Sequence, residues 1–119
     1  MSEYKLGAVE SRFADIIWQN APLSSSLLAK LAEQELSWKK STTYTVLKRL
    51  CDRGLFRNEG GTVIVLIPRD EFYALQSEAF VEETFAGSLP AFLAAFGSRK
   101  KLSAREVDEL KHVIDSMRG

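Results

Sequence analysis

The chain has 119 residues, of which 45% are hydrophobic and 27% are charged, and its 16 Lys and Arg balance its 16 Asp and Glu. This composition is ordinary for a small globular protein and excludes disordered, collagenous and fibrous classes. The longest stretch without a charged residue, 84–98, has 15 residues and includes two Gly and one Pro. It falls short of the roughly 18 apolar residues of a membrane span, so no membrane insertion is expected.

The N-terminal residues and the cysteine content indicate the cellular compartment of the protein. Four charged residues, Glu3, Lys5, Glu10 and Arg12, precede any long apolar run, which is not the pattern of a secretory leader. Cys51 is the single cysteine, so no intramolecular disulfide can form. We therefore expect a protein of the reducing cytoplasm.

Two helices are predicted first. Apolar residues recur at helical spacing between Leu6 and Asn20, and Pro22 follows as a stop signal. A second helix is expected from the serines at 24–26, whose hydroxyls can cap its first turn, to about Leu36. The residues expected to face inward are Leu6, Val9, Phe13, Ile16 and Ile17 in the first helix and Leu27, Leu28, Leu31 and Ala32 in the second.

The third predicted helix, Ser41–Arg53, is amphipathic. Its apolar side carries Thr43, Val46, Leu47 and Leu50. The remaining surface carries Ser41, Thr42, Tyr44, Thr45, Lys48 and Arg49. Six bases and one acid lie between Lys39 and Arg57, so an anionic partner would dock on this segment.

A β-hairpin follows the third helix. Gly54 suits a helix end, and the segments Leu55–Glu59 and Val63–Ile67 are predicted as strands with Gly60 and Gly61 at the tip. Three helices followed by a hairpin is the order of a winged helix-turn-helix unit. We therefore predict a mainly α fold with a small β-hairpin, in which residues 1–69 form a winged-helix DNA-binding domain.

Residues 70–119 are predicted to form a helical dimerisation region. Helices are expected over Asp70–Ala86, Leu89–Phe96 and Ser103–Met117, the last with a capping box. Three short helices cannot bury their many large apolar side chains among themselves, so a twofold homodimer is expected. The residues predicted to form its interface are Phe80, Phe85, Leu89, Phe92, Leu93, Leu110 and Ile114.

Double-stranded DNA is the anionic partner that suits the third helix, because the major groove admits a helix and each phosphate carries a charge. Basic side chains would bind phosphates, whereas short or flat ones would reach base edges. The predicted phosphate contacts are Lys39, Lys40, Lys48, Arg49 and Arg57. The predicted base contacts are Thr42, Tyr44 and Thr45, with Ser41 at the start of the same helix.

Several motifs together resemble the penicillinase-repressor (BlaI/MecI/CopY) family. They are Ile16-Ile17-Trp18, Trp38, the run Ser41-Thr42-Thr43-Tyr44-Thr45-Val46-Leu47-Lys48-Arg49-Leu50, Arg53-Gly54-Leu55, and Glu106-Val107-Asp108-Glu109-Leu110 in the acidic last helix. The resemblance covers the chain from Leu6 to Met117.

This resemblance implies a dimeric transcriptional repressor of dyad operators with TACA/TGTA-type half-sites, released through a membrane sensor-protease pathway. Thr42, Thr45 and Arg49 match the operator-contacting helix of the family, and Arg57 matches a backbone contact on the wing. The sequence departs from the family pattern at Lys39-Lys40 and at Tyr44. The bond Ala95-Phe96 matches the Asn-Phe cleavage site of lactam-responsive members, with Phe kept and Asn replaced.

Other residues are interpreted as structural. Trp18 and Trp38 border helix ends and are expected to fill the core. One His, His112, and one Cys, Cys51, supply too few ligands for a metal, and no cofactor is expected. No nucleophile, base and cleft can be assembled, so no enzyme is predicted.

The alternative function is a winged-helix module that binds another protein and does not bind DNA. The surface of such a module would show aromatic anchors and fewer Lys.

Overall fold

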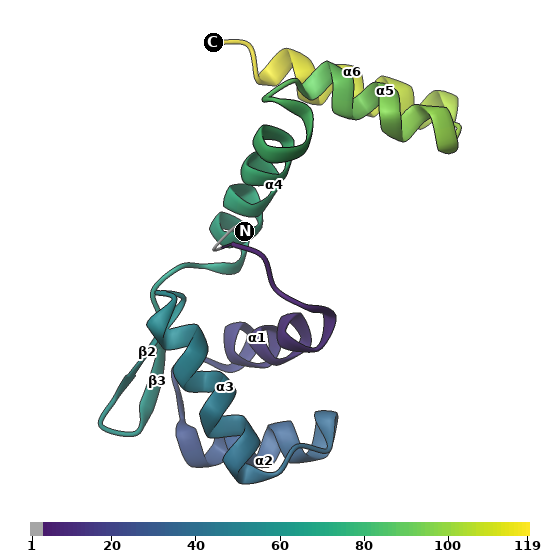
Figure 1. Ribbon diagram of the computed structural model, residues 1–119. Helices are drawn as coiled ribbons and strands as arrows, with labels where there is room; N and C mark the ends of the chain where they lie inside the picture. The colour runs from purple at the N-terminus through teal and green to yellow at the C-terminus, as the bar shows by residue number, and fades with distance from the viewer. Residues whose placement is uncertain (1–3) are drawn as a thin grey trace. The chain divides into compact units, whose positions relative to one another are not determined.

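The computed structural model describes residues 4–119, so residues 1–3 of the predicted first domain lie outside the described residues. The fold is mainly α-helical, with a winged-helix unit followed by helices, as predicted (Figure 1). The elements in chain order are α1 (Ala8–Asn20), β1 (Leu23–Ser24), α2 (Ser25–Leu36), α3 (Lys40–Asp52), β2 (Phe56–Glu59), β3 (Thr62–Val65), α4 (Arg69–Phe85), α5 (Leu89–Arg99) and α6 (Ala104–Ser116).

The predicted hairpin is present as β2 and β3, which form the wing. The strands are antiparallel, and their register ends at the pair Glu59 and Thr62. Gly60 and Gly61 make the two-residue tip, with φ angles of 59° and 92°. This turn needs positive φ at both positions, which glycine adopts without the steric penalty of a Cβ.

The sheet has a third strand that the sequence analysis misses. β1 pairs antiparallel with β3, with Leu23 opposite Val63 and Ser24 opposite Thr62, so the strand order is β1-β3-β2. The amide of Ser25 also donates to the carbonyl of Gly61 at 2.8 Å. A strand of two residues is too short to show an alternating pattern, so the sequence predicts the hairpin but not this third strand.

The core of the first unit lies between α1, α2, α3 and the sheet. Its fully buried large side chains include Phe13, Ile17, Leu28, Leu50, Leu55, Phe56, Val63 and Phe72. Two inward predictions are wrong, because Val9 is 49% exposed and Leu27 is 46% exposed. Each lies in the first turn of its helix. There the apolar residues extend beyond the face of the helix that packs on the core.

Both tryptophans pack against the core, as predicted. The indole N–H of Trp18 donates to the carbonyl of Ile67 at 3.0 Å, which joins α1 to the segment after the wing. The ring of Trp18 lies 5.5 Å from that of Phe56, and the ring of Trp38 lies 4.9 Å from that of Phe13. These contacts give each indole a packing role, and Trp18 also has its hydrogen-bond partner.

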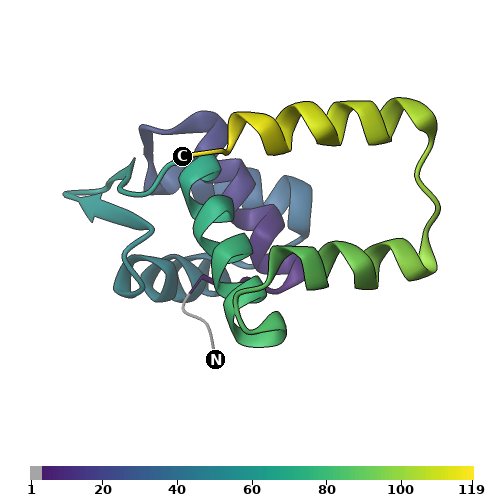
Figure 2. The ribbon, with the colours of Figure 1, turned by 90° about the horizontal axis from the view of Figure 1, so that it is seen from above.

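The chain divides into two compact units, the first ending at Ala79 and the second covering Phe80–Gly119. This division falls within α4 and lies later than the predicted boundary at residue 69. Phe72 explains the difference, because its fully buried ring lies 5.7 Å from that of Trp18 and ties the start of α4 to the first unit. In the second unit, α5 and α6 run antiparallel (Figure 2).

One buried hydroxyl predicts a stability change. Oγ1 of Thr43 is buried and has no hydrogen-bond partner among the described residues. Thr43→Val replaces this hydroxyl by a methyl of similar size and should raise the free energy of unfolding by about 1 kcal/mol, because an unpaired buried polar group is costly. Urea denaturation followed by circular dichroism measures the change.

The neighbouring Thr42 gives the control. It is exposed, so Thr42→Val should leave the free energy of unfolding within about 0.5 kcal/mol of the original. A destabilised Thr43→Val chain would mean that the hydroxyl has a stabilising partner.

Candidate nucleic-acid interface

The helix α3 begins at Lys40 and ends at Asp52, one residue earlier at each end than predicted. After it, Gly54 has φ 86°, in the left-handed region that favours glycine. The amide of Leu55 then donates back to the carbonyl of Leu50 at 3.1 Å. This helix end turns the chain directly into β2, so the wing starts beside the end of α3.

The two sides of α3 differ as the sequence predicts. The inward side, Thr43, Val46, Leu47 and Leu50, is buried in the core. The outward residues Ser41, Thr42, Thr45, Lys48 and Arg49 are exposed. Tyr44 is half-buried and packs against the core, and the ammonium of Lys40 lies 6.0 Å from its ring centroid. Tyr44 is thus less open to a partner than the threonines.

The hydroxyl of Thr45 is turned toward its own helix. Oγ1 donates to the carbonyl of Ser41 at 2.9 Å, the preceding turn of α3. Its one proton is therefore used within the protein. The methyl group and a lone pair of the oxygen are what Thr45 can offer to a partner.

Three predicted phosphate contacts form ion pairs within the first unit. Lys48 pairs with Asp52 at 3.1 Å, Arg57 with Glu59 at 2.9 Å, and Arg49 with Glu10 at 3.1 Å. Lys39 and Lys40 are exposed at the start of α3.

Two of the acidic partners were missed by the sequence analysis. Glu59 could have been found, because residues two apart on a strand share one face. Glu10 has no such signal, since 39 residues separate it from Arg49. The charge of this surface is therefore lower than the count between residues 39 and 57 indicates.

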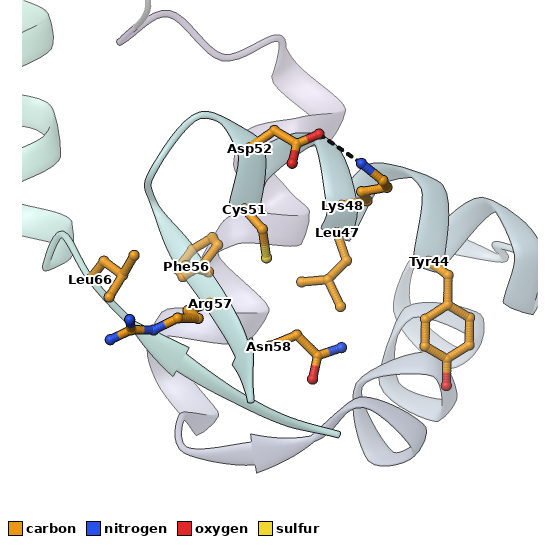
Figure 3. A pocket seen from close by; sticks show the side chains of 9 residues that line it. All are labelled: Tyr44, Leu47, Lys48, Cys51, Asp52, Phe56, Arg57, Asn58 and Leu66. Carbon is orange, nitrogen blue, oxygen red and sulfur yellow. Dashed lines mark hydrogen bonds and ion pairs between the residues drawn. The ribbon is translucent and has the colours of Figure 1, made fainter. Parts of the chain in front are cut away.

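A hollow of about 460 Å³ lies between α3 and the wing (Figure 3). Its lining residues are Tyr44, Leu47, Lys48, Cys51, Asp52, Phe56, Arg57, Asn58 and Leu66. The thiol of Cys51 points into it (Figure 3). Burial, and then the nearby Asp52 carboxylate, raise the pKa of this thiol above its ordinary value. Cys51 is therefore predominantly protonated near neutral pH and is a poor nucleophile.

The predicted dimerisation residues lie in the second unit and remain open to solvent to different degrees. Phe80, Leu89 and Ile114 are exposed, whereas Phe85, Phe92, Leu93 and Leu110 are half-buried. The rings of Phe80, Phe85 and Phe92 lie 5.7–6.0 Å from one another. Among Phe80–Gly119, all of which the structure describes, no side chain is buried.

A second hollow of about 470 Å³ lies between α5 and α6. Its apolar lining comes from Phe92, Leu93, Phe96, Leu102, Leu110 and Val113. The candidate cleavage pair Ala95 and Phe96 lies within α5, and Phe96 is 48% exposed. Both residues are exposed at their side chains while their backbone is helical.

No helix within residues 4–119 is long and apolar enough to cross a membrane. Within the same residues, no three or more His, Cys, Asp or Glu side chains gather in a way that could hold a metal ion. His112 is exposed on α6.

Comparison with known proteins places these features in a family context. Residues 6–116 match the sequence model of the family described as penicillinase repressor. The methicillin resistance regulatory protein MecI of Staphylococcus epidermidis is 20% identical over 116 residues, and the alignment covers 94% of each chain. The match thus extends over both units.

Proposed function

The chain belongs to the penicillinase repressor family, a family of transcriptional regulators, and we propose that it represses transcription by binding a dyad DNA operator as a homodimer. The observation that carries this proposal is the division of α3. Its apolar side is fixed in the core, while Ser41, Thr42, Thr45, Lys48 and Arg49 stay exposed beside the wing. A helix held in this way can enter a major groove about 12 Å wide without unfolding the domain.

In this proposal the outward residues have two roles. Lys39, Lys40, Lys48 and Arg49 bind phosphates and fix the register of α3, and Arg57 of the wing binds the flanking backbone. Ser41, Thr42, Tyr44 and Thr45 face the base edges. The exposed ion pairs of the bases do not prevent this, because surface pairs contribute little and a phosphate can replace the carboxylate.

The second unit supports the homodimer part of the proposal. Its helices leave large apolar side chains exposed, among them Phe80, Phe96, Val113, Ile114 and Met117. A second copy of the chain would cover these surfaces, and a twofold arrangement would present one α3 to each half-site of a dyad. Occupation of a promoter in the cytoplasm by such a dimer would block transcription.

The experiment that tests DNA binding is a fluorescence anisotropy titration with two duplexes, one carrying TACA and TGTA half-sites and one scrambled. The chain should prefer the dyad duplex, and log affinity should fall with log salt with a slope of about −0.9 per phosphate contact. Equal binding to both duplexes would remove sequence-specific repression. No binding to either would favour the alternative, a winged-helix module that binds protein.

The same titration tests the role of Thr45. The hydroxyl of Thr45 donates its proton to the backbone carbonyl of Ser41, so the methyl group is the part of Thr45 that can contact a thymine methyl. Thr45→Val keeps that methyl and should retain the preference for the dyad duplex. Thr45→Ser keeps the hydroxyl but loses the methyl, and it should weaken dyad binding about fivefold, which corresponds to about 1 kcal/mol.

Uracil-substituted DNA provides the matched control. Replacing the half-site thymines by uracil removes the same contact from the DNA side, so it should weaken binding of the original chain and leave Thr45→Ser unchanged. If Thr45→Ser instead keeps the dyad affinity and Thr45→Val loses it, the DNA contacts the hydroxyl and not the methyl group.

The homodimer is tested at Ile114. Ile114→Asp places a charge in the proposed interface, where it would lack a partner, and it should shift the chain from dimer to monomer on a sizing column. Dyad affinity should then fall about a hundredfold or more, because two linked half-sites no longer bind together. His112→Asp, at an exposed position on another side of α6, is the control and should leave the dimer intact. A dimeric Ile114→Asp chain would contradict this interface.

We further propose that a membrane sensor-protease pathway releases the repressor by cleaving the bond between Ala95 and Phe96. This bond lies inside α5, so a protease that binds extended chain would need the helix to open locally first. After incubation with the activated sensor, mass spectrometry should show fragments that end at Ala95 and begin at Phe96. A chain that stays full length would contradict cleavage.

A further inference from the structure

We infer that Glu10 is a positioning residue that sets DNA specificity by holding Arg49, an inference that rests on the proposed DNA binding. Nη1 of Arg49 donates to Oε2 of Glu10 at 3.1 Å. The two residues come from different helices, Glu10 from the first turn of α1 and Arg49 from the last turn of α3. This ion pair therefore ties an outward base of α3 to a fixed point on another element.

The carboxylate of Glu10 is itself held in place. Its second oxygen, Oε1, accepts from the backbone amide of Gly7 at 3.4 Å, at the start of α1. The Glu10 side chain is 25% exposed, whereas that of Arg49 is 55% exposed. The acid is thus the more enclosed partner, and the arginine is the partner that extends toward solvent.

The ion pairs of Lys48 and Arg57 are of another kind. Lys48 pairs with Asp52 one turn along the same helix, and Arg57 pairs with Glu59 on the same strand. Each of those acids lies on the same element as its base, so neither pair ties its base to another part of the unit. Arg49 is restrained by an acid that does not belong to α3, so its guanidinium is directed by the packing of α1 on the rest of the unit.

Holding Arg49 affects different phosphates differently. A guanidinium has five N–H donors, and the single bond to Glu10 leaves others for a phosphate that lies where α3 is in register. A phosphate at any other position binds Arg49 only if the guanidinium leaves Glu10, which breaks the ion pair. Since non-specific binding consists of phosphate contacts, Glu10 penalises it more than operator binding.

The test is Glu10→Gln in the full chain, titrated against the dyad duplex and the scrambled duplex between about 50 and 200 mM KCl. Glutamine keeps an oxygen for the amide of Gly7 and loses the negative charge. Affinity for the scrambled duplex should rise about threefold at low salt, because a phosphate no longer has to break the Arg49–Glu10 ion pair, and a partly exposed pair of this kind is worth about 0.6 kcal/mol. The salt slope should steepen by about 0.9, equivalent to one more phosphate contact. Dyad affinity should rise less, so the preference for the dyad falls.

Two further variants separate this role from a general charge effect. Glu71→Gln removes the same charge from an exposed position in the first turn of α4 and should change neither the salt slope nor the preference. In an Arg49→Gln background, Glu10→Gln should leave the salt slope unchanged, because Glu10 acts through Arg49. An increase of scrambled-duplex affinity that persists without Arg49 would mean simple repulsion and would overturn the inference.

Failure of the inference is distinguishable from failure of the proposed function. If the original chain prefers the dyad duplex and Glu10→Gln has the same preference and salt slope, the pair only links α1 to α3 and the inference is wrong. If the original chain does not distinguish the two duplexes, the proposed function fails, and this inference fails with it.

Discussion

The burial of one side of α3 is the constraint on which the rest of the first unit depends. Val46, Leu47 and Leu50 fill the space between α1, α2 and the sheet, so the rotation of α3 about its axis is fixed. Side chains at the remaining positions then point to solvent whatever their chemistry. Because β2 starts within a few residues of the end of α3, the same packing also fixes the base of the wing.

Acidic side chains beside the outward bases limit the attraction of this surface for anions in general. The chain has no net charge, and the acids Glu10, Asp52 and Glu59 lie beside three of the outward bases. A surface of this kind attracts polyanions less strongly than the basic residues alone would. In the proposed function, contacts at defined positions then determine where the protein binds, and weak affinity for arbitrary duplex leaves it free to reach its operator.

Periodicity in the sequence was sufficient to predict the helices, the wing and the two sides of α3, because burial follows helical spacing closely there. It failed where contacts join distant residues. β1 depends on pairing with Val63, and Glu10 meets Arg49 across 39 residues, and neither leaves a local pattern. No local pattern indicates that the first compact unit extends into α4 either, since Phe72 belongs to its core through Trp18. A reading of local patterns cannot supply such pairings.

No side chain between Phe80 and Gly119 is buried, and this links the lifetime of the protein to its concentration in the cell. In the proposed homodimer these helices are buried only against a second copy, so mass action stabilises them and their folding depends on the abundance of the chain. Freshly made or scarce chains would expose these helices to degradation, whereas paired chains would have longer lifetimes. Degradation would then keep the protein from accumulating when its concentration is too low for the dimer to form.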